Sequence, residues 1–217
     1  MRRWGVLAVG LVIVTTALFS VTPADAAERW KLRLQAAWSS PQGDYREVDG
    51  DEVITADYIA SFGLGLQVER MVSKRVGIEL GVLWSEPDVN VVIAEPPVRL
   101  EIEAPFRITP VTLGVNYHLG SGGKTDFYFG PAVAYVFYDD IVLSDPDFGR
   151  EKLTVDDDYA WGLTLGVDVN VTKSGHWAFN SELRWMNGST DFKNPEGETR
   201  VVDVDPFYLT LGVTYRF

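Results

Sequence analysis

The last seven residues of the chain alternate between apolar side chains and small or polar ones. From Leu211 to Phe217, leucine, valine, tyrosine and phenylalanine occupy every second position, and glycine, threonine and arginine lie between them. Successive side chains of a strand point to opposite faces, so one face of this segment is apolar and the other polar. A strand with a lipid face and a lumen face that ends on an aromatic residue is typical of the closing strand of a bacterial outer-membrane barrel.

Eight segments of the chain show this two-residue alternation. A chain of 217 residues has room for eight strands of about 10 residues each together with their loops. We therefore predict an all-β fold, an eight-stranded antiparallel up-and-down transmembrane β-barrel. The predicted strands are Trp30–Trp38, Tyr58–Arg70, Val76–Ser85, Phe106–Leu119, Phe127–Tyr138, Tyr159–Thr172, Trp177–Asn187 and Pro206–Phe217.

The gaps between the predicted strands alternate between long and short. Such barrels have short periplasmic turns and long external loops, so the alternation gives the topology and places both termini in the periplasm. The long gaps are Ser39–Asp57, Glu86–Pro105, Asp139–Asp158 and Gly188–Asp205, and the short gaps are Met71–Arg75, Gly120–Asp126 and Lys173–His176.

The positions of the aromatic residues provide independent support for the predicted membrane barrel. They gather near the two ends of the strands, as expected for rings that prefer the two membrane interfaces. In a soluble β-sandwich the same residues would lie in mid-strand. The outer girdle consists of Trp38, Trp84, Phe137, Trp161, Trp185 and Phe207, and the inner girdle of Trp30, Tyr117, Phe127, Trp177, Tyr215 and Phe217.

The amino-terminal segment has the form of an export signal. Arg2 and Arg3 precede an apolar run, and Ala24–Ala26 has the small-x-small form of a cleavage site. We therefore expect residues 1–26 to be a cleaved signal peptide and residues 27–217 to form the barrel. The alternative is an anchoring helix, but the run is shorter than the roughly 20 residues that a membrane span needs.

Composition excludes several classes of function. Removing the two arginines and one aspartate of residues 1–26 from the 19 basic and 31 acidic side chains of the chain leaves 17 and 30. This excess of acid argues against a nucleic-acid partner. The chain has no cysteine, so it has neither a disulfide framework nor a thiolate metal site. We expect no cofactor.

The inward positions toward the periplasmic end of the predicted strands are charged. Four acids face four bases, and buried charges are tolerated only in pairs, so we predict a cross-strand network that plugs the lower lumen. Glu182 and Arg184 are expected to lie within reach of Asp168 on the neighbouring strand. The predicted plug consists of Lys31, Arg33, Glu69, Glu79, Asp168, Glu182, Arg184 and Arg216, with Asn170 and His118 beside it.

The inward positions toward the outer end are small and weakly polar. They predict a roomy mouth above the charged floor, a cup that admits a small apolar ligand. The alternative is that the glycines only accommodate the curvature of the barrel and the charges only stabilise it. The predicted upper lumen consists of Gly63, Gly65, Gly81, Leu83, Gly114, Ala132, Ala134 and Gly162.

Two prolines lie inside predicted strands. Pro110 and Pro131 each remove a backbone donor from the sheet. We therefore predict a local bulge or a weakened seam in the fourth and fifth strands. Ligand blocked by the charged floor could leave sideways through this part of the wall.

Several segments of the second half of the chain resemble the OmpW family of outer-membrane proteins. They are Pro110–Leu119, Tyr128–Tyr135, Trp161–Gly162, Gly166–Asp168 and Val202–Pro206, together with the closing Tyr215–Phe217. The resemblance implies an eight-stranded barrel with a narrow apolar channel, associated with uptake of small hydrophobic molecules and lateral release into the membrane. One departure is the acidic composition of the long loops, which argues against an apolar gate carried by them.

Other functions compete with this hypothesis. A structural or receptor barrel would use the acidic loops to bind a partner without transport. The loop residues Asp139, Asp140, Asp145, Asp147, Glu151 and Asp156–Asp158 could hold Ca²⁺ or Mg²⁺, or bridge through such ions to lipopolysaccharide, although no calcium-loop spacing is present. Catalysis is disfavoured, because His118 and His176 fall at the periplasmic end, out of reach of the outer leaflet.

The sequence also predicts the partners of the protein. We expect outer-membrane lipid and lipopolysaccharide around the wall and a small hydrophobic ligand in the lumen. The barrel assembly machinery is expected to recognise the closing strand that ends at Phe217.

Overall fold

The computed structural model describes residues 30–42, 44–49, 52–95, 98–120, 123–145, 149–193, 197 and 199–217. The predicted signal peptide, residues 1–26, lies outside the described residues. Within the part of the chain that is described, no helix is long and apolar enough to cross a membrane.

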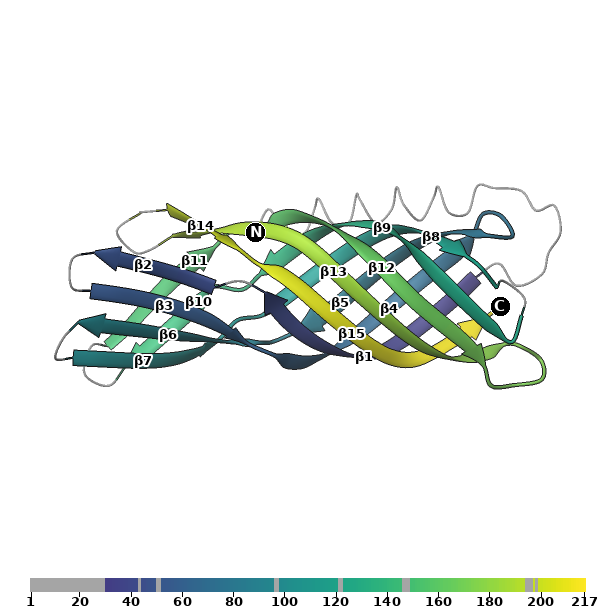
Figure 1. Ribbon diagram of the computed structural model, residues 1–217, viewed down its shortest axis with the longest axis horizontal. Coiled ribbons are helices and arrows are strands. Elements are labelled where there is room, and N and C mark those ends of the chain that lie inside the picture. The colour runs from purple at the N-terminus through teal and green to yellow at the C-terminus, as the bar shows by residue number, and fades with distance from the viewer. Residues whose placement is uncertain are drawn as a thin grey trace.

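Eight long antiparallel strands close into a barrel (Figure 1). Each strand pairs with the next one along the wall, and β1 pairs with the last strand, β15, in a register from Lys31 opposite Arg216 to Gln42 opposite Asp205. The predicted eight-stranded fold is confirmed. The barrel strands are β1 (Trp30–Gln42), β4 (Ser61–Met71), β5 (Val76–Ser85), β8 (Ile108–His118), β9 (Thr125–Tyr138), β12 (Asp158–Asn170), β13 (Trp177–Lys193) and β15 (Asp205–Arg216).

The barrel wall is apolar outside and polar inside. Along β1, Leu32, Leu34 and Trp38 are 37–58% exposed, whereas Lys31 and Arg33, which alternate with the leucines, are buried. This is the reverse of a soluble protein, and it follows from a bilayer in which every second side chain contacts lipid. The outward apolar surface gains its stability from lipid, so the interior must be filled by polar groups that satisfy one another.

Seven further strands lie in the predicted long gaps, where the sequence indicated only loops. They extend well beyond one end of the barrel, which we call the hairpin end (Figure 1). Tyr58 was predicted to begin a barrel strand, but it belongs to one of these further strands. Ala60 separates that strand from the barrel strand that follows it. The strands are β2 (Asp44–Asp49), β3 (Glu52–Ile59), β6 (Asp88–Glu95) and β7 (Val98–Pro105) in one sheet, the hairpin β10 (Ile141–Asp145) and β11 (Gly149–Val155), and β14 (Thr199–Asp203) beside β13.

The opposite end of the barrel carries three tight turns, and we call it the turn end. The first and last described residues meet there: Trp30 N donates to Phe217 O at 3.1 Å, and Phe217 N donates to Trp30 O at 3.0 Å. Both ends of the barrel chain therefore lie on the same rim as the short turns, as the even number of strands requires.

Two gaps interrupt the hydrogen-bonded ladders of the wall, and each contains a proline. The β5–β8 pairing stops at Val111 and resumes at Ile108, so Pro110 lies in the gap. The β8–β9 pairing stops at Ala132 and resumes at Phe129, so Pro131 lies in the second gap. Proline has no N–H to donate, and the predicted weak seam in these two strands is confirmed.

Gly130 is required where the strands approach each other closely at the second gap. A Cβ on Gly130 would lie 1.8 Å from the carbonyl oxygen of Val115, whereas the nearest atom to a Cβ on Gly114 would be 3.5 Å away. We predict that Gly130→Ala lowers the free energy of unfolding by about 1–3 kcal/mol, the usual cost of overpacking, in urea titrations with lipid vesicles. Gly114→Ala is the matched control, and equal stability of the two variants would contradict this assignment.

Candidate functional site

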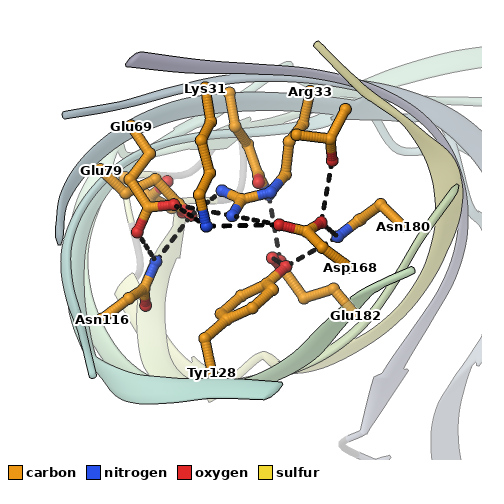
Figure 2. Close-up of polar contacts among 12 residues, drawn as sticks. Lys31, Arg33, Glu69, Glu79, Asn116, Tyr128, Asp168, Asn180 and Glu182 are labelled. Carbon is orange, nitrogen blue, oxygen red and sulfur yellow. Dashed lines mark hydrogen bonds and ion pairs between the residues drawn. The ribbon is translucent and has the colours of Figure 1, made fainter. Parts of the chain in front are cut away.

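The eight residues predicted to plug the lumen all lie inside the barrel, toward the turn end. None of them is more than 6% exposed. Figure 2 shows Lys31 and Arg33 meeting Glu69 and Asp168 from other parts of the wall. We call the five carboxylates and five basic side chains that meet here the ionic layer: Lys31, Arg33, Arg184, Arg216 and His118 with Glu69, Glu79, Asp126, Asp168 and Glu182.

Arg33 lies at the centre of the ionic layer and is fully buried. Its Nη2 donates to Glu69 Oε2 at 2.7 Å and its Nη1 to Glu79 Oε2 at 3.2 Å. The guanidinium also lies over the ring of Tyr128, 4.6 Å from its centroid. One cation on β1 therefore joins two carboxylates and an aromatic face from three other strands, which suits the planar, multiply donating guanidinium better than an ammonium.

Arg184 and Glu182 extend the layer toward the hairpin end. Arg184 Nη2 lies 2.5 Å from Glu79 Oε1 and 2.9 Å from Glu182 Oε1, and Glu182 accepts a hydrogen bond from the Tyr128 hydroxyl at 2.9 Å. The sequence placed this pair within reach of Asp168. The structure corrects this expectation, because Arg184 reaches across the lumen to Glu79 on β5 instead.

Asp168 forms its own centre, with three cations around one carboxylate oxygen. Lys31 and Arg33 lie 3.4 Å from its Oδ2, and Arg216 lies 3.5 Å away. Asn180 and Thr214 donate to the other oxygen at 2.8 and 2.9 Å. Five groups from β1, β13 and β15 therefore depend on one side chain of β12.

His118 lies between two carboxylates. Its Nε2 is 2.9 Å from Glu69 Oε1, and its Nδ1 is 2.9 Å from Asp126 Oδ2. Ionised carboxylates only accept hydrogen bonds, so both ring nitrogens must carry a proton and the ring is an imidazolium. The ionic layer then contains equal numbers of positive and negative groups.

Sequence reasoning missed Asp126 and the uncharged partners of the ionic layer. Asp126 was assigned to a turn, but it is the second residue of β9 and is 2% exposed. Extending the two-residue alternation back from Tyr128 by one step would have found it. The other missed inward groups are Gln35, Gln67, Thr112, Asn116, Tyr128, Asn180, Thr210 and Thr214.

The small residues predicted for the upper lumen also face inward and are buried: Gly63, Gly65, Gly81, Leu83, Gly114, Ala132, Ala134 and Gly162. However, Ile108, Val136, Met186 and Tyr208 are at most 2% exposed and pack in one apolar cluster with Leu83, Ala37 and Ala134. The expectation of a roomy mouth is therefore corrected, because large side chains that the sequence reasoning overlooked occupy space beside the small ones.

Four aromatic side chains cover this cluster where the barrel meets the hairpins, and we call them the aromatic cap: Tyr58, Phe106, Tyr138 and Phe192. Phe106 is fully buried and stacks on Tyr138, with ring centroids 5.5 Å apart and planes 4° apart. Tyr58 and Phe192 lie 6.0 Å from it on other sides. Tyr58, Phe106 and Tyr138 fall in segments that were predicted as barrel strands, and Phe192 falls in a predicted loop, so the cap leaves the expectation about a loop-borne gate untested.

The acidic residues of the third long gap are largely engaged in local structure. Asp139 pairs with Arg107 at 2.8 Å, Asp140 with Lys152 at 2.6 Å, and Asp156 with Lys193. Among the described residues, no group of three or more acids and histidines is arranged to hold a metal ion. Asp147 lies outside the described residues.

The lipid-facing wall carries an apolar groove of about 640 Å³ beside the Pro131 gap. Gly130 and Pro131 line it together with the inward residues Asn116 and Thr164. The groove therefore lies over the part of the wall where the β8–β9 ladder is interrupted. Its outward lining includes Val115, Tyr117, Phe129, Leu163, Leu165 and Leu183.

A family model described as the outer membrane protein beta-barrel domain matches residues 11–217. The chain belongs to this family of outer-membrane barrels. Its hairpin end is thus external and its turn end periplasmic. Both histidines lie at the periplasmic end, as predicted: His118 ends β8, and His176 lies in the turn before β13.

Individual relatives agree with the predicted OmpW-like barrel. Outer membrane protein AlkL of Ectopseudomonas oleovorans is 29% identical over 111 residues, which are 50% of this chain and 46% of AlkL. An uncharacterised outer-membrane protein of Sinorhizobium fredii, y4mB, is 28% identical over 115 residues, 51% of this chain and 48% of its own. The matched segment thus spans about half the length of these curated relatives.

Solved structures show the same fold. The crystal structure of OprG from Pseudomonas aeruginosa superposes with a TM-score of 0.69 at 21% identity, over 88% of this chain and 96% of OprG. The solid-state NMR structure of AlkL in lipid bilayers gives a TM-score of 0.55 at 22% identity, over 91% and 96% of the two chains.

We predict that His118→Gln destabilises the barrel, because it removes a cation that Glu69 shares with Arg33 and that Asp126 shares with Lys31. Leaving a buried charge with no partner costs about 3–5 kcal/mol; since Arg33 and Lys31 remain in place, the free energy of unfolding in lipid vesicles should fall by less than that. His176→Gln is the control, since His176 lies in a periplasmic turn, where its Nδ1 is 3.0 Å from the backbone oxygen of Arg216. A His118 variant as stable as the control would show that the imidazolium is not needed.

Proposed function

We propose that this protein takes up small apolar molecules from outside the cell and releases them sideways into the outer membrane. The observation that carries the proposal is the order of the layers along the lumen. An apolar layer lies under the external hairpins, the ionic layer lies below it, and an interrupted wall with an apolar groove lies beside them. The OmpW resemblance implies the same class of solute.

Entry requires movement of the aromatic cap. Phe106 is enclosed by Tyr58, Tyr138 and Phe192, and these rings are held on the bases of the hairpins rather than deep in the barrel. Burial raises the pKa of the Tyr58 hydroxyl, so this ring enters the cap uncharged. An apolar solute can replace the ring contacts that it breaks, whereas a hydrated ion cannot.

The ionic layer would then act as the floor. Its charged groups satisfy one another at 2.5–3.5 Å, so an apolar molecule entering it would separate pairs without offering replacement hydrogen bonds. That cost amounts to several kcal/mol for each buried ion. Direct passage into the periplasm is therefore disfavoured, and the eight charged residues predicted from sequence fulfil the role of a plug in this proposal.

The exit would be the Pro131 gap. The β8–β9 ladder is interrupted there, so fewer hydrogen bonds need to be broken than along an uninterrupted pair of strands, and the groove outside offers apolar surface on which the leaving molecule can lie. The proposed partners are thus a small hydrophobic ligand in the lumen and the surrounding lipid. We also propose that the barrel assembly machinery recognises the closing strand, which ends at Phe217.

The cap is tested by Phe106→Ala. Removing this ring should raise the initial rate of uptake of a fluorescent apolar solute by liposomes containing the refolded protein, by about fivefold for each 1 kcal/mol of barrier removed. Phe62→Ala is the matched control, because Phe62 is 81% exposed on the outer surface. Heat-modified migration on gels confirms that both variants fold, and an unchanged rate in a folded Phe106 variant would contradict the gate.

The exit is tested by Pro131→Val. Valine supplies the missing N–H, and a new backbone hydrogen bond of about 1 kcal/mol should stiffen the seam and reduce delivery of solute into the bilayer about fivefold. The control is Pro105→Val, the same exchange at the end of β7 outside the barrel wall. Equal delivery by the two variants would contradict a sideways exit at Pro131.

A receptor or anchoring role is the second candidate, and one observation favours it. The upper lumen is packed with large buried side chains, as an anchor without transport would be, while the acidic hairpins project beyond the barrel to meet a partner or, through divalent ions, lipopolysaccharide. Absence of apolar uptake by a verified folded barrel would favour this role.

A further inference from the structure

The periplasmic turns carry a charge opposite to that of the external segments. Residues 72–75, 119–124 and 171–176 include Lys74, Arg75, Lys124 and Lys173 and no aspartate or glutamate. A local excess of positive charge attracts anions. Charge alone does not make a site, so the geometry of the turns decides whether one exists.

Two of these turns enclose a pocket of about 520 Å³ at the periplasmic rim, which we call the periplasmic notch. Its walls are tied together by hydrogen bonds between the turns. Asn170 N donates to Lys124 O at 2.8 Å, and Asn170 Nδ2 donates to Gly123 O at 2.6 Å. The notch is lined by Gly123, Lys124, Asn170, Val171, Thr172, Lys173, Ser174, Gly175 and Arg216.

Gly175 shapes the second wall of the notch. Its φ of 78° lies in the left-handed region, which glycine adopts at little cost, and its N–H donates to Thr172 O at 3.2 Å. A Cβ on Gly175 would meet nothing within 4 Å, so this corner of the notch is open. The turn is thus fixed in a shape that leaves space between Lys173 and Arg216.

Arg216 gives the notch an incompletely compensated charge. It is 6% exposed, and Asp168 is the one carboxylate that pairs with it among the described residues, at 3.5 Å. Lys31 and Arg33 share that same carboxylate oxygen. Its Nη1 contacts Asn170 and Gly175 O, whereas Nη2 faces Asp168, and both Nη2 and Nε are enclosed by the protein without a hydrogen bond.

We propose that the periplasmic notch binds a phosphate group. Arg216 contributes its positive charge from the floor of the notch, and Lys124 and Lys173 contribute theirs from the turns at either side. Guanidinium donors match the oxygens of phosphate. The phosphate could belong to an inner-leaflet phospholipid, because the aromatic girdle pair Trp177 and Tyr215, 4.8 Å apart, marks headgroup level nearby, or it could be free phosphate.

The first experiment titrates inorganic phosphate into the folded, isotope-labelled protein in an uncharged detergent, with sodium chloride of equal ionic strength as reference. We expect saturable NMR shifts at the amides of Ser174 and Gly175 and at Arg216 Nε–H. The second experiment compares nanodiscs of a neutral, phosphate-free glycolipid with nanodiscs of the same glycolipid that also contain phosphatidylglycerol. Shifts at the same nuclei with phosphatidylglycerol alone identify the headgroup as the source, and shifts with free phosphate identify a soluble anion.

The double variant Lys124→Gln/Lys173→Gln should weaken this binding about tenfold, since it removes two charge-assisted contacts. Lys74→Gln is the control, because Lys74 belongs to a periplasmic turn outside the notch. Failure of both phosphate sources to shift these signals would overturn the proposal. An equal loss in the control and the double variant would overturn it too, because it would mean attraction to the whole basic rim.

Discussion

Charge pairing inside the barrel is the interaction on which the rest of this structure depends. The bilayer requires an apolar outer wall, so the polar side chains of the strands point into the lumen. Where they are buried there without water, these side chains must form hydrogen bonds and ion pairs with one another. Arg33, fully buried among Glu69, Glu79 and Asp168, draws three strands toward β1. His118 and Asp126 complete the balance of charge. Which side chain is tolerated at an inward position therefore depends on the charges that other strands place opposite it.

The separation of charge from apolar surface along the lumen links this interior to function. The ionic layer occupies the periplasmic half, and the apolar cluster around Met186 and Tyr208 lies between it and the aromatic cap. In the function that we propose, this order favours the entry of apolar solutes at the external end and opposes their passage at the periplasmic end. The interrupted seam at Pro131 would then give a solute in the lumen a route that does not cross the charges.

Much of this fold could be predicted because a lipid-facing wall imposes a strict two-residue alternation. The eight strands, the rim of each turn, the inward charges and the effect of Pro131 all follow from that pattern. Asp126 was missed because the strand was begun one residue too late. Packing around Tyr208 could not be predicted, since side chains that fill a lumen meet across the barrel rather than along the sequence. The external strands were missed because acidic residues hid their alternation.

The most direct test of the account is the single-channel conductance of the refolded wild-type protein in planar bilayers. A lumen closed by paired charges should carry no sustained ion current, even under conditions in which liposomes containing the same preparation take up an apolar solute. A steady ohmic conductance would mean that water and ions pass the ionic layer, and it would contradict both the closed floor and the sideways route.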